Sequence, residues 1–254
     1  MRAAGLRTVR ATRYVTPLRE GGSLPALVEA DDDGLYVVKF RGAGQGAKAL
    51  VAEVIVGELA RALGLPVPEI VLVDLDPELG RAEPDPEIQE LIGASAGLNV
   101  GLDFLPSALA YSPAAGPAPA PETAADVVWL DALATNVDRT PRNPNLLVWH
   151  GRTWLIDHGA ALYLQHVGLD PEAHAARSFP PIRDHVLLPA AGSILEAGER
   201  LVPRLAGGTV GTVAALVPDA WLAGERARYV AYLERRLAAS RSFAEEAEEA
   251  RAAA

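Results

Sequence analysis

Two stretches of this 254-residue chain decide its fold, Asn136-Val-Asp-Arg-Thr-Pro-Arg-Asn143 and Ile156-Asp-His-Gly159. Two short apolar runs lie between them, at residues 146–149 and 153–156, separated by a polar His-Gly-Arg tripeptide. Alternating apolar residues on both sides of such a tripeptide predict a β-hairpin. The run upstream, residues 123–135, has a helical pattern. The sequence therefore predicts a helix, a polar loop, a hairpin and a sharp glycine turn, in that order.

Three side chains in these stretches have the chemistry that phosphoryl transfer from a nucleotide requires. Asp138 can orient or deprotonate an attacking hydroxyl, and Asn143 and Asp157 supply oxygen ligands suited to Mg²⁺. An Asp-x4-Asn pattern alone is common and is equally explained by a polar turn. The complete order of helix, loop, hairpin and Asp-x-Gly is much rarer, and it carries the prediction.

The first part of the chain predicts a small sheet with one main helix. An Asp-Asp-Asp-Gly stretch between two apolar runs indicates a hairpin, and a later Gly and Pro end the helical pattern. The candidate strands are residues 12–15, 26–30, 35–40 and 70–75, and the candidate helix is 48–63. A further extended piece at 98–105 lies within a proline-dense region whose most linker-like part is 113–121.

Lysine is scarce in this chain: of 23 basic residues only Lys39 and Lys48 are lysines. Because an ammonium and a guanidinium are not equivalent, a lysine kept in an arginine-rich sequence can have a lysine-specific task. Lys39 lies on a candidate strand that is followed by a helix, the arrangement of a phosphate-binding lysine. The helix offers Glu53 as its better-placed partner, with Glu58 as the alternative, whereas Lys48 has only a place at the helix start.

A turn suited to binding phosphate precedes these strands. Gly21, Gly22 and Ser23 do not complete a Gly-x-Gly-x-x-Gly pattern, but the backbone amides of such a turn can bind an anion. A second glycine run, at residues 42–46, resembles a dinucleotide-binding crossover. Its spacing and the lack of continuing strand–helix alternation favour a plain connection into the helix.

Composition limits the other functional classes. With 33 acidic against 23 basic residues, the net charge is −10. Binding of nucleic-acid phosphates through an extended basic surface is therefore not expected. Cysteine is absent, which excludes thiolate chemistry, and no run suggests a signal peptide or a membrane span. We expect a cytoplasmic protein without membrane insertion.

Taken together, these motifs resemble the protein-kinase-like fold and, more narrowly, the short single-domain members of the HipA-like kinase family. The resemblance covers about residues 10–190. Five segments carry it: the Gly-Gly-Ser-x-Pro loop, the Val-Val-Lys-Phe strand, Ala-Leu-Gly-Leu-Pro-Val-Pro at 62–68, the Asn-x-Asp-Arg loop and Ile-Asp-His-Gly. It implies an α+β fold with two lobes, a small β-rich lobe at 1–105 with one main helix and a mostly helical lobe at 106–254.

The resemblance also implies an activity and a division of roles. ATP and Mg²⁺ are the expected cofactors, with Asp138 as base, Asn143 and Asp157 on the metal, and Lys39 on the phosphates. Chain order places Asn99 and Leu102 beside the adenine. The acceptor would be a hydroxyl group, most simply one on a protein serine or threonine.

Two departures leave alternatives open. Asn136 stands where many protein kinases have histidine, so the loop must be braced in another way, and no Ala-Pro-Glu segment is recognisable. A lipid or small-molecule kinase of the same fold, or an inactive nucleotide-binding scaffold, would share most of these residues. The Glu/Ala-rich stretch at 243–254 is expected to be a solvated or frayed helix.

Overall fold

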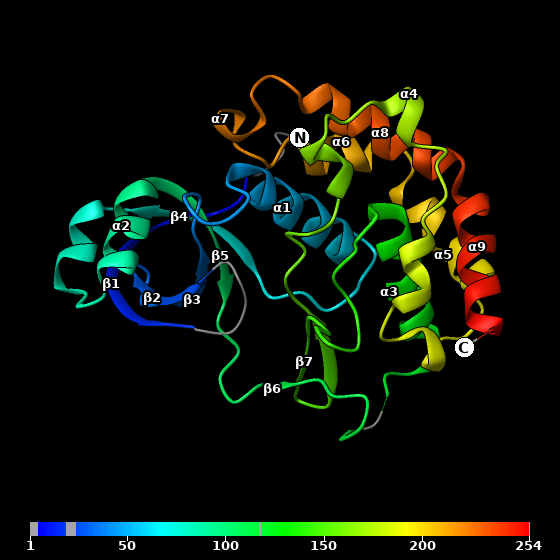
Figure 1. Cartoon of the computed structure of the whole chain (residues 1–254), viewed down its shortest axis with the longest axis horizontal. Helices are drawn as coiled ribbons and strands as arrows, with labels where there is room; N and C mark the ends of the chain where they lie inside the picture. The colour runs from blue at the N-terminus through cyan, green and yellow to red at the C-terminus, as the bar shows by residue number, and fades with distance from the viewer. Residues whose placement is uncertain (1–4, 19–23, 117, 254) are drawn as a thin grey trace.

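The computed structural model describes residues 5–18, 24–116 and 118–253, and its first part is a small closed β-barrel (Figure 1). The strand order is β1-β2-β3-β5-β4, and every neighbouring pair is antiparallel except β1 and β4, which close the barrel in parallel. Its strands are β1 Thr8–Pro17, β2 Ala26–Ala30, β3 Leu35–Lys39, β4 Ile70–Leu75 and β5 Gly97–Asp103. The predicted strands are confirmed, and this antiparallel barrel is incompatible with a doubly wound dinucleotide-binding sheet.

Small side chains fill the barrel interior. Ala26, Val28 and Val38 are completely buried there, together with Val71 and Val73 from β4. On β5, a Cβ atom at Gly101 would lie 2.6 Å from a methyl of Val73, so the narrow interior accepts only glycine at this position. The barrel is therefore a packed core rather than a pore.

Helix α1, Ala47–Ala62, packs against the outside of the barrel. Ile70 and Leu72 of β4 point outward into the same core cluster as α1, while Val71 and Val73 point inward. This two-sided burial explains why β4 is a nearly continuous apolar run. Because α1 also contacts helices from the second half of the chain, the helix is buried almost all round.

A second helix of the first half was not predicted from the sequence. Helix α2, Pro86–Ala94, follows the 3₁₀ helix η1, Pro77–Ala82, in the region that its prolines mark as irregular. Pro86 occupies the first turn, where proline is favoured, and the Asp85 side chain accepts a 3.0 Å hydrogen bond from the backbone N–H of Glu87. The prolines here begin helices instead of breaking them.

Helix α3, Pro121–Ala134, is the buried centre of the second half. It ends at Thr135 in a left-handed conformation, with φ of 49°, and the chain then enters the polar loop. The predicted hairpin follows as β7, Leu146–Trp149, and β8, Arg152–Leu155, and the short β6, Leu109–Ala110, adds a third strand.

Beyond the hairpin, the regular elements of the described chain are all helices. The elements are η2 Tyr163–His166, α4 Pro171–His174, η3 Pro180–Asp184, η4 Leu188–Ala190, α5 Ile194–Leu205, α6 Thr209–Ala214, α7 Asp219–Leu222, α8 Arg226–Ala238 and α9 Ser240–Ala252.

The expectation of a solvated or frayed terminal helix was wrong for α9. Phe243, Ala244 and Ala247 are buried against α3 and α5, and the Phe243 ring lies 5.5 Å from that of Trp129. Glu245 and Glu249 are exposed, whereas Glu246 and Glu248 accept hydrogen bonds from the backbone N–H groups of Phe179 and Ile194. The abundance of acidic residues obscures the apolar stripe in the sequence.

The fold thus combines a barrel with a helical body, and the predicted mixture of helices and sheets is confirmed. In Figure 1 the barrel strands lie to the left, α3, α5, α8 and α9 lie to the right, and α1 runs between them. Among the described residues no helix combines the length and apolarity needed to span a membrane.

Candidate active site

Lys39, the last residue of β3, lies between two carboxylates from distant parts of the chain. Its Nζ is 2.5 Å from Oε2 of Glu53 on α1 and 2.6 Å from Oδ1 of Asp157, which follows β8. Glu58, the alternative partner, pairs with Arg61 instead. Lys39 therefore connects the barrel and α1 with residues 157–159, which we call the predicted metal loop because Asp157 is its predicted metal ligand.

Burial decides the electrostatics of this cluster. The Glu53 side chain is completely buried, that of Lys39 is 12% exposed and that of Asp157 is 42% exposed. Burial acts to raise the pKa of Glu53, but the Lys39 charge and a hydrogen bond from His158 outweigh it and lower the pKa to about 2. Burial likewise acts to lower the pKa of Lys39, but the charges of Glu53 and Asp157 leave it raised. The cluster holds a charged ammonium beside a fixed and a more exposed carboxylate.

His158 links the metal loop to Glu53. Its backbone N–H donates to Glu53 Oε2 at 2.8 Å, and its Nδ1 lies 3.4 Å from Oε1. Asp157, just before it, has a φ of 55°, a conformation that most side chains avoid. Buried His158 therefore turns the Asp157 carboxylate toward Lys39.

The predicted base lies in a separate polar cluster. Asp138 is half-buried, and its Oδ2 accepts hydrogen bonds from Asn143 Nδ2 at 2.8 Å and from Asn145 Nδ2 at 3.3 Å. Asn145 also donates to the Asp138 backbone carbonyl at 3.1 Å. The structure thus brings Asp138 and Asn143 together and adds Asn145, which the sequence analysis did not select. The only hint in the sequence was the residue type, because asparagine tolerates a left-handed backbone such as the φ of 50° found at position 145.

Beneath this loop, a buried ionic group replaces the missing histidine brace. Asp131 Oδ2 accepts from Arg139 Nε at 2.5 Å and lies 2.9 Å from His185 Nε2, while Asp131 Oδ1 accepts from Asn136 Nδ2 at 2.9 Å. Arg139 also donates to the carbonyls of Asn145 and Ile156, on the two sides of the hairpin. The brace therefore fixes residues 136–143, the predicted catalytic loop, and the approach to Asp157 together.

The charge state of this brace follows from its burial. Burial acts to raise the pKa of Asp131, but the Arg139 charge and the His185 contact lower it. The pKa of His185 is lowered, chiefly by burial, although Asp131 opposes that shift. A charged Asp131–Arg139 pair with a neutral His185 satisfies these contacts.

The side chains of the two residues predicted near the adenine are buried and make contacts within the fold. Asn99 is completely buried, and it accepts from the Arg41 N–H at 2.8 Å while donating to the carbonyls of Ser95 and Gly97 at 2.8 Å. Leu102 is buried in the core shared with α1. Gly21, Gly22 and Ser23 lie outside the described residues.

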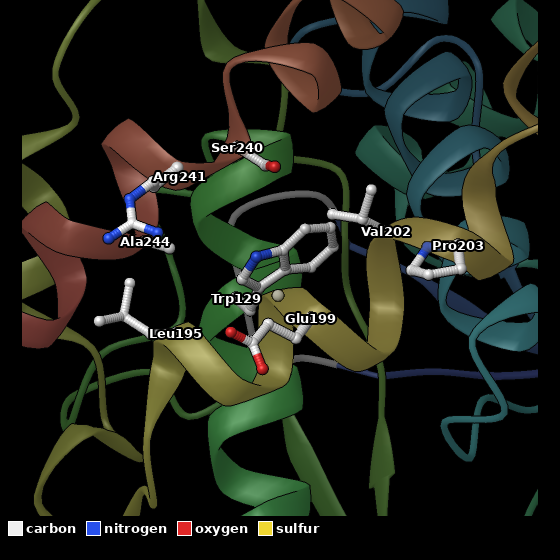
Figure 2. A pocket seen from close by; sticks show the side chains of 9 residues that line it. Trp129, Leu195, Glu199, Val202, Pro203, Ser240, Arg241 and Ala244 are labelled. Carbon is white, nitrogen blue, oxygen red and sulfur yellow. The ribbon is translucent and has the colours of Figure 1, made fainter.

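Asp157 and Asn143 each carry an oxygen atom of the kind that a hard cation prefers. Asp157 Oδ2 and Asn143 Oδ1 accept no hydrogen bond among the described residues, and both side chains reach solvent. Carboxylate and amide oxygens are the ligands that Mg²⁺ prefers in proteins. A cavity of about 340 Å³ lies elsewhere, between α3, α5 and α9 over Trp129, and none of the predicted site residues lines it (Figure 2).

Comparisons with known proteins bear on the family and the fold of this chain. The family model described as HipA-like kinase matches residues 12–184. Among solved structures, the chain is similar to the proinflammatory kinase CtkA of Helicobacter pylori, with a TM-score of 0.55 and 14% identity over 96% of this chain and 99% of that one. No curated protein matches the chain. The structural likeness to CtkA, at 14% identity, shows a shared fold alone. The family match covers most of the chain, including Lys39, Glu53, Asp138, Asn143 and Asp157 but not His185. The protein belongs to the HipA-like kinase family, as its motifs predicted.

Proposed function

We propose that this protein is an ATP- and Mg²⁺-dependent kinase that transfers the γ-phosphoryl group to a hydroxyl of a protein acceptor. The observation that carries the proposal is the position of Lys39 between buried Glu53 and partly exposed Asp157. A purely structural ion pair would not need the second, exposed carboxylate. Binding of a polyphosphate needs a cation held by a fixed partner and a carboxylate able to turn to a metal.

The proposal divides the molecule into two lobes, 1–105 and 106–254, with the nucleotide between them. The barrel and α1 would contribute Lys39 and Glu53, and the loops around the hairpin would contribute the other groups. The side chains of Asn99 and Leu102 are buried, so the adenine ring would be contacted by the main chain that leaves β5 instead.

Lys39 and Asp157 have distinct tasks in this proposal. Glu53 keeps the Lys39 ammonium charged and oriented toward the phosphates, because its own carboxylate cannot leave its buried position. Asp157 and Asn143 would hold Mg²⁺, which neutralises charge on the phosphates when bound. Since Asp157 is 42% exposed, it can exchange its contact with Lys39 for the metal while Glu53 retains the lysine.

Asp138 is placed to act on the acceptor hydroxyl. Both amide donors engage Oδ2, and the other oxygen, Oδ1, accepts no hydrogen bond among the described residues. Asp138 Oδ1 would orient the hydroxyl and accept its proton as the oxygen attacks the γ-phosphorus, while the bond from that phosphorus to the bridging oxygen breaks and ADP leaves. Transfer would depend mostly on positioning and charge stabilisation.

Replacement of the proposed base tests the proposal. We expect Asp138→Asn to reduce phosphate transfer from ATP at least about 100-fold, the lower range for a positioned acid or base. The substitution is nearly isosteric, so stabilisation by ATP with Mg²⁺ in a thermal-shift assay should persist. Asp74→Asn, at an exposed position of β4, is the control and should behave like wild type. Full transfer activity in Asp138→Asn would show that the base assignment is wrong.

The same assays distinguish the inactive-scaffold alternative. A scaffold would be stabilised by ATP and would transfer no phosphate to any cellular protein, whereas absence of stabilisation with or without Mg²⁺ would contradict both alternatives. A phosphoproteome comparison between cells with wild type and with Asp138→Asn would identify the acceptor. Phosphorylation confined to lipids or small molecules would replace the protein acceptor in the proposal.

A further inference from the structure

Lys48, the second lysine of the chain, makes a contact that the kinase roles do not explain. It is the second residue of α1, and its Nζ donates to the backbone carbonyl of Gln165 at 2.5 Å. Gln165 lies in η2, in the segment that follows Asp157 and His158. Lys48 therefore joins the start of α1 to the chain just beyond the metal loop.

The local structure of α1 gives no reason for a cation at this position. The first turn of a helix favours negative charge, so a cation there is unfavourable. Helix α1 has no acidic residue in its first turn and no side-chain cap at Gly46 to offset the charge. The charge of Lys48 is therefore unfavourable for its own helix, and the hydrogen bond to the Gln165 carbonyl is the interaction that compensates for it.

Gln165 is an anchored partner. Its side chain is buried, with Oε1 accepting from Tyr229 Oη at 2.8 Å and Nε2 donating to the Ala161 carbonyl at 3.3 Å. The Leu162 N–H also donates to the carbonyl of Ala134, the last residue of α3, at 2.7 Å. Lys48 therefore binds to a segment already fixed on α8 and α3.

The metal loop is consequently attached to α1 at two points. Glu53 accepts from the His158 N–H at 2.8 Å, and Lys48 donates to Gln165 at 2.5 Å. The contacts with Tyr229 and Ala134 hold the segment on α8 and α3, and the two contacts with α1 fix its orientation relative to that helix. Asp157 lies beside the first contact and carries the left-handed backbone angle that this orientation maintains.

We propose that Lys48 is a positioning residue, which holds the segment of residues 157–166 on α1 so that Asp157 faces the metal position. This role rests on the proposed function, in which Asp157 binds Mg²⁺. Lys48 touches neither nucleotide nor acceptor in this proposal, and it acts only through Gln165 and the loop.

Three variants separate positioning from general stability. Lys48→Met removes the donor and keeps the aliphatic stem, whereas Lys48→Arg keeps a cation able to reach a carbonyl. Arg61→Met is the matched control, because Arg61 lies on the same helix and also donates to a backbone carbonyl, that of Val67 at 3.1 Å, which lies outside residues 157–166. If stability alone matters, Lys48→Met and Arg61→Met should have similar effects.

Two measurements on the full-length protein test the role. Hydrogen exchange without nucleotide should be faster over residues 158–167 in Lys48→Met, and unchanged there in Arg61→Met and Lys48→Arg. The Mg²⁺ concentration that gives half-maximal phosphate transfer should rise about fivefold or more in Lys48→Met, the scale of one lost hydrogen bond, and stay within about twofold in the other two variants. Tyr229→Phe removes the hydrogen bond from Tyr229 Oη to the Gln165 side chain and should reproduce both effects. This variant replaces Lys48→Met in the test if Lys48→Met does not fold.

The outcomes separate the two proposals. Unchanged exchange, or faster exchange with an unchanged Mg²⁺ requirement, would overturn the positioning role while leaving the kinase proposal intact. An equal rise of the Mg²⁺ requirement in Arg61→Met would also overturn it, because the effect would then be general. A wild-type protein that transfers no phosphate at any Mg²⁺ concentration, but shows the expected exchange differences, would contradict the proposed function instead.

Discussion

At the scale of single residues, Lys39 has the most restricted surroundings at the site. Its ammonium reaches two carboxylate oxygens at 2.5 and 2.6 Å in a largely buried position, and a planar guanidinium is longer and spreads its donors over a larger area. We expect Lys39→Arg to lower phosphate transfer at least about tenfold, equivalent to ~1.4 kcal/mol in the barrier, although the charge is conserved. Steady-state rates with ATP would measure it, with Lys48→Arg as the lysine-to-arginine control. Equal rates in the two variants would show that Lys39 contributes only its charge.

His185 makes the stability of the protein depend on pH. Because the pKa of His185 is lowered in the folded protein, the unfolded chain takes up a proton first as the pH falls below about 6.5, the ordinary value. The unfolded state then binds more protons than the folded one, so stability declines from about pH 6.5 downward, by at most ~1.4 kcal/mol per pH unit.

Urea unfolding at pH 7.5 and pH 5.5 would measure this effect. We expect wild type to lose free energy of unfolding between the two values, and His185→Gln to lose less, because glutamine keeps a donor for Asp131 without titrating. Exposed His150 provides the control, and His150→Gln should retain the wild-type difference. A difference in His185→Gln as large as that of wild type would assign the titration to another group.

The sequence revealed those site residues whose role depends on their type and their order along the chain. Lys39, Asp138 and Asp157 stand at recognisable positions relative to a strand, a loop and a hairpin. Asp131 and His185 could not be found in this way, because they meet only when η3 brings residue 185 against α3. For the same reason, the contact of Lys48 with Gln165 is invisible without the fold.

At the scale of elements, buried helices were easier to predict than half-exposed ones. The unbroken apolar character of α1 and α3 gives a strong pattern, and their predicted ranges differ from the observed ones by at most two residues at either end. Helix α2 was missed because its start signals, Asp85 and Pro86, resemble those of a turn. The docking of α9 was missed because three small or aromatic residues on one face carry it.

The crossing of α5 over α3 depends on a glycine. A Cβ atom at Gly198 would lie 2.9 Å from Nε1 of Trp129, a rigid buried indole. Alanine normally stabilises a helix interior by about 1 kcal/mol relative to glycine, but here we expect Gly198→Ala to destabilise the protein by roughly 1–3 kcal/mol.

Chemical denaturation of two glycine variants would measure this effect. Gly211, in helix α6, has open space where its Cβ would lie, so Gly211→Ala should be neutral or stabilising. A Gly198→Ala protein as stable as Gly211→Ala would mean that the two helices can separate without loss.

At the scale of the whole molecule, the two apolar cores divide the chain unequally. One fills the barrel and reaches α2, and the other extends from α1 through α3 to α9. The family match ends at residue 184, yet Trp129 within it is covered by α5 and α9, beyond that limit. The matched region is therefore not a complete folding unit.

Truncation would test this dependence. We expect a chain of residues 1–184 to lack a cooperative thermal transition and to bind an apolar dye, because the surface of α3 would be exposed. In the full chain, Phe243→Ala should lower the free energy of unfolding by ~3 kcal/mol. A sharp melting transition in the truncated chain would show that residues 1–184 fold cooperatively without the helices that follow them.

The position of α9 also has a consequence for how the protein is made. All five strands of the barrel lie before residue 104, so a nascent chain can complete the barrel while the ribosome is still translating the catalytic loop. The loop itself must wait for His185, and the cover of α3 must wait for α9. During translation, the barrel that carries Lys39 can therefore form before the loop that carries Asp138 is braced, and we expect the proposed activity to appear only after synthesis of α9.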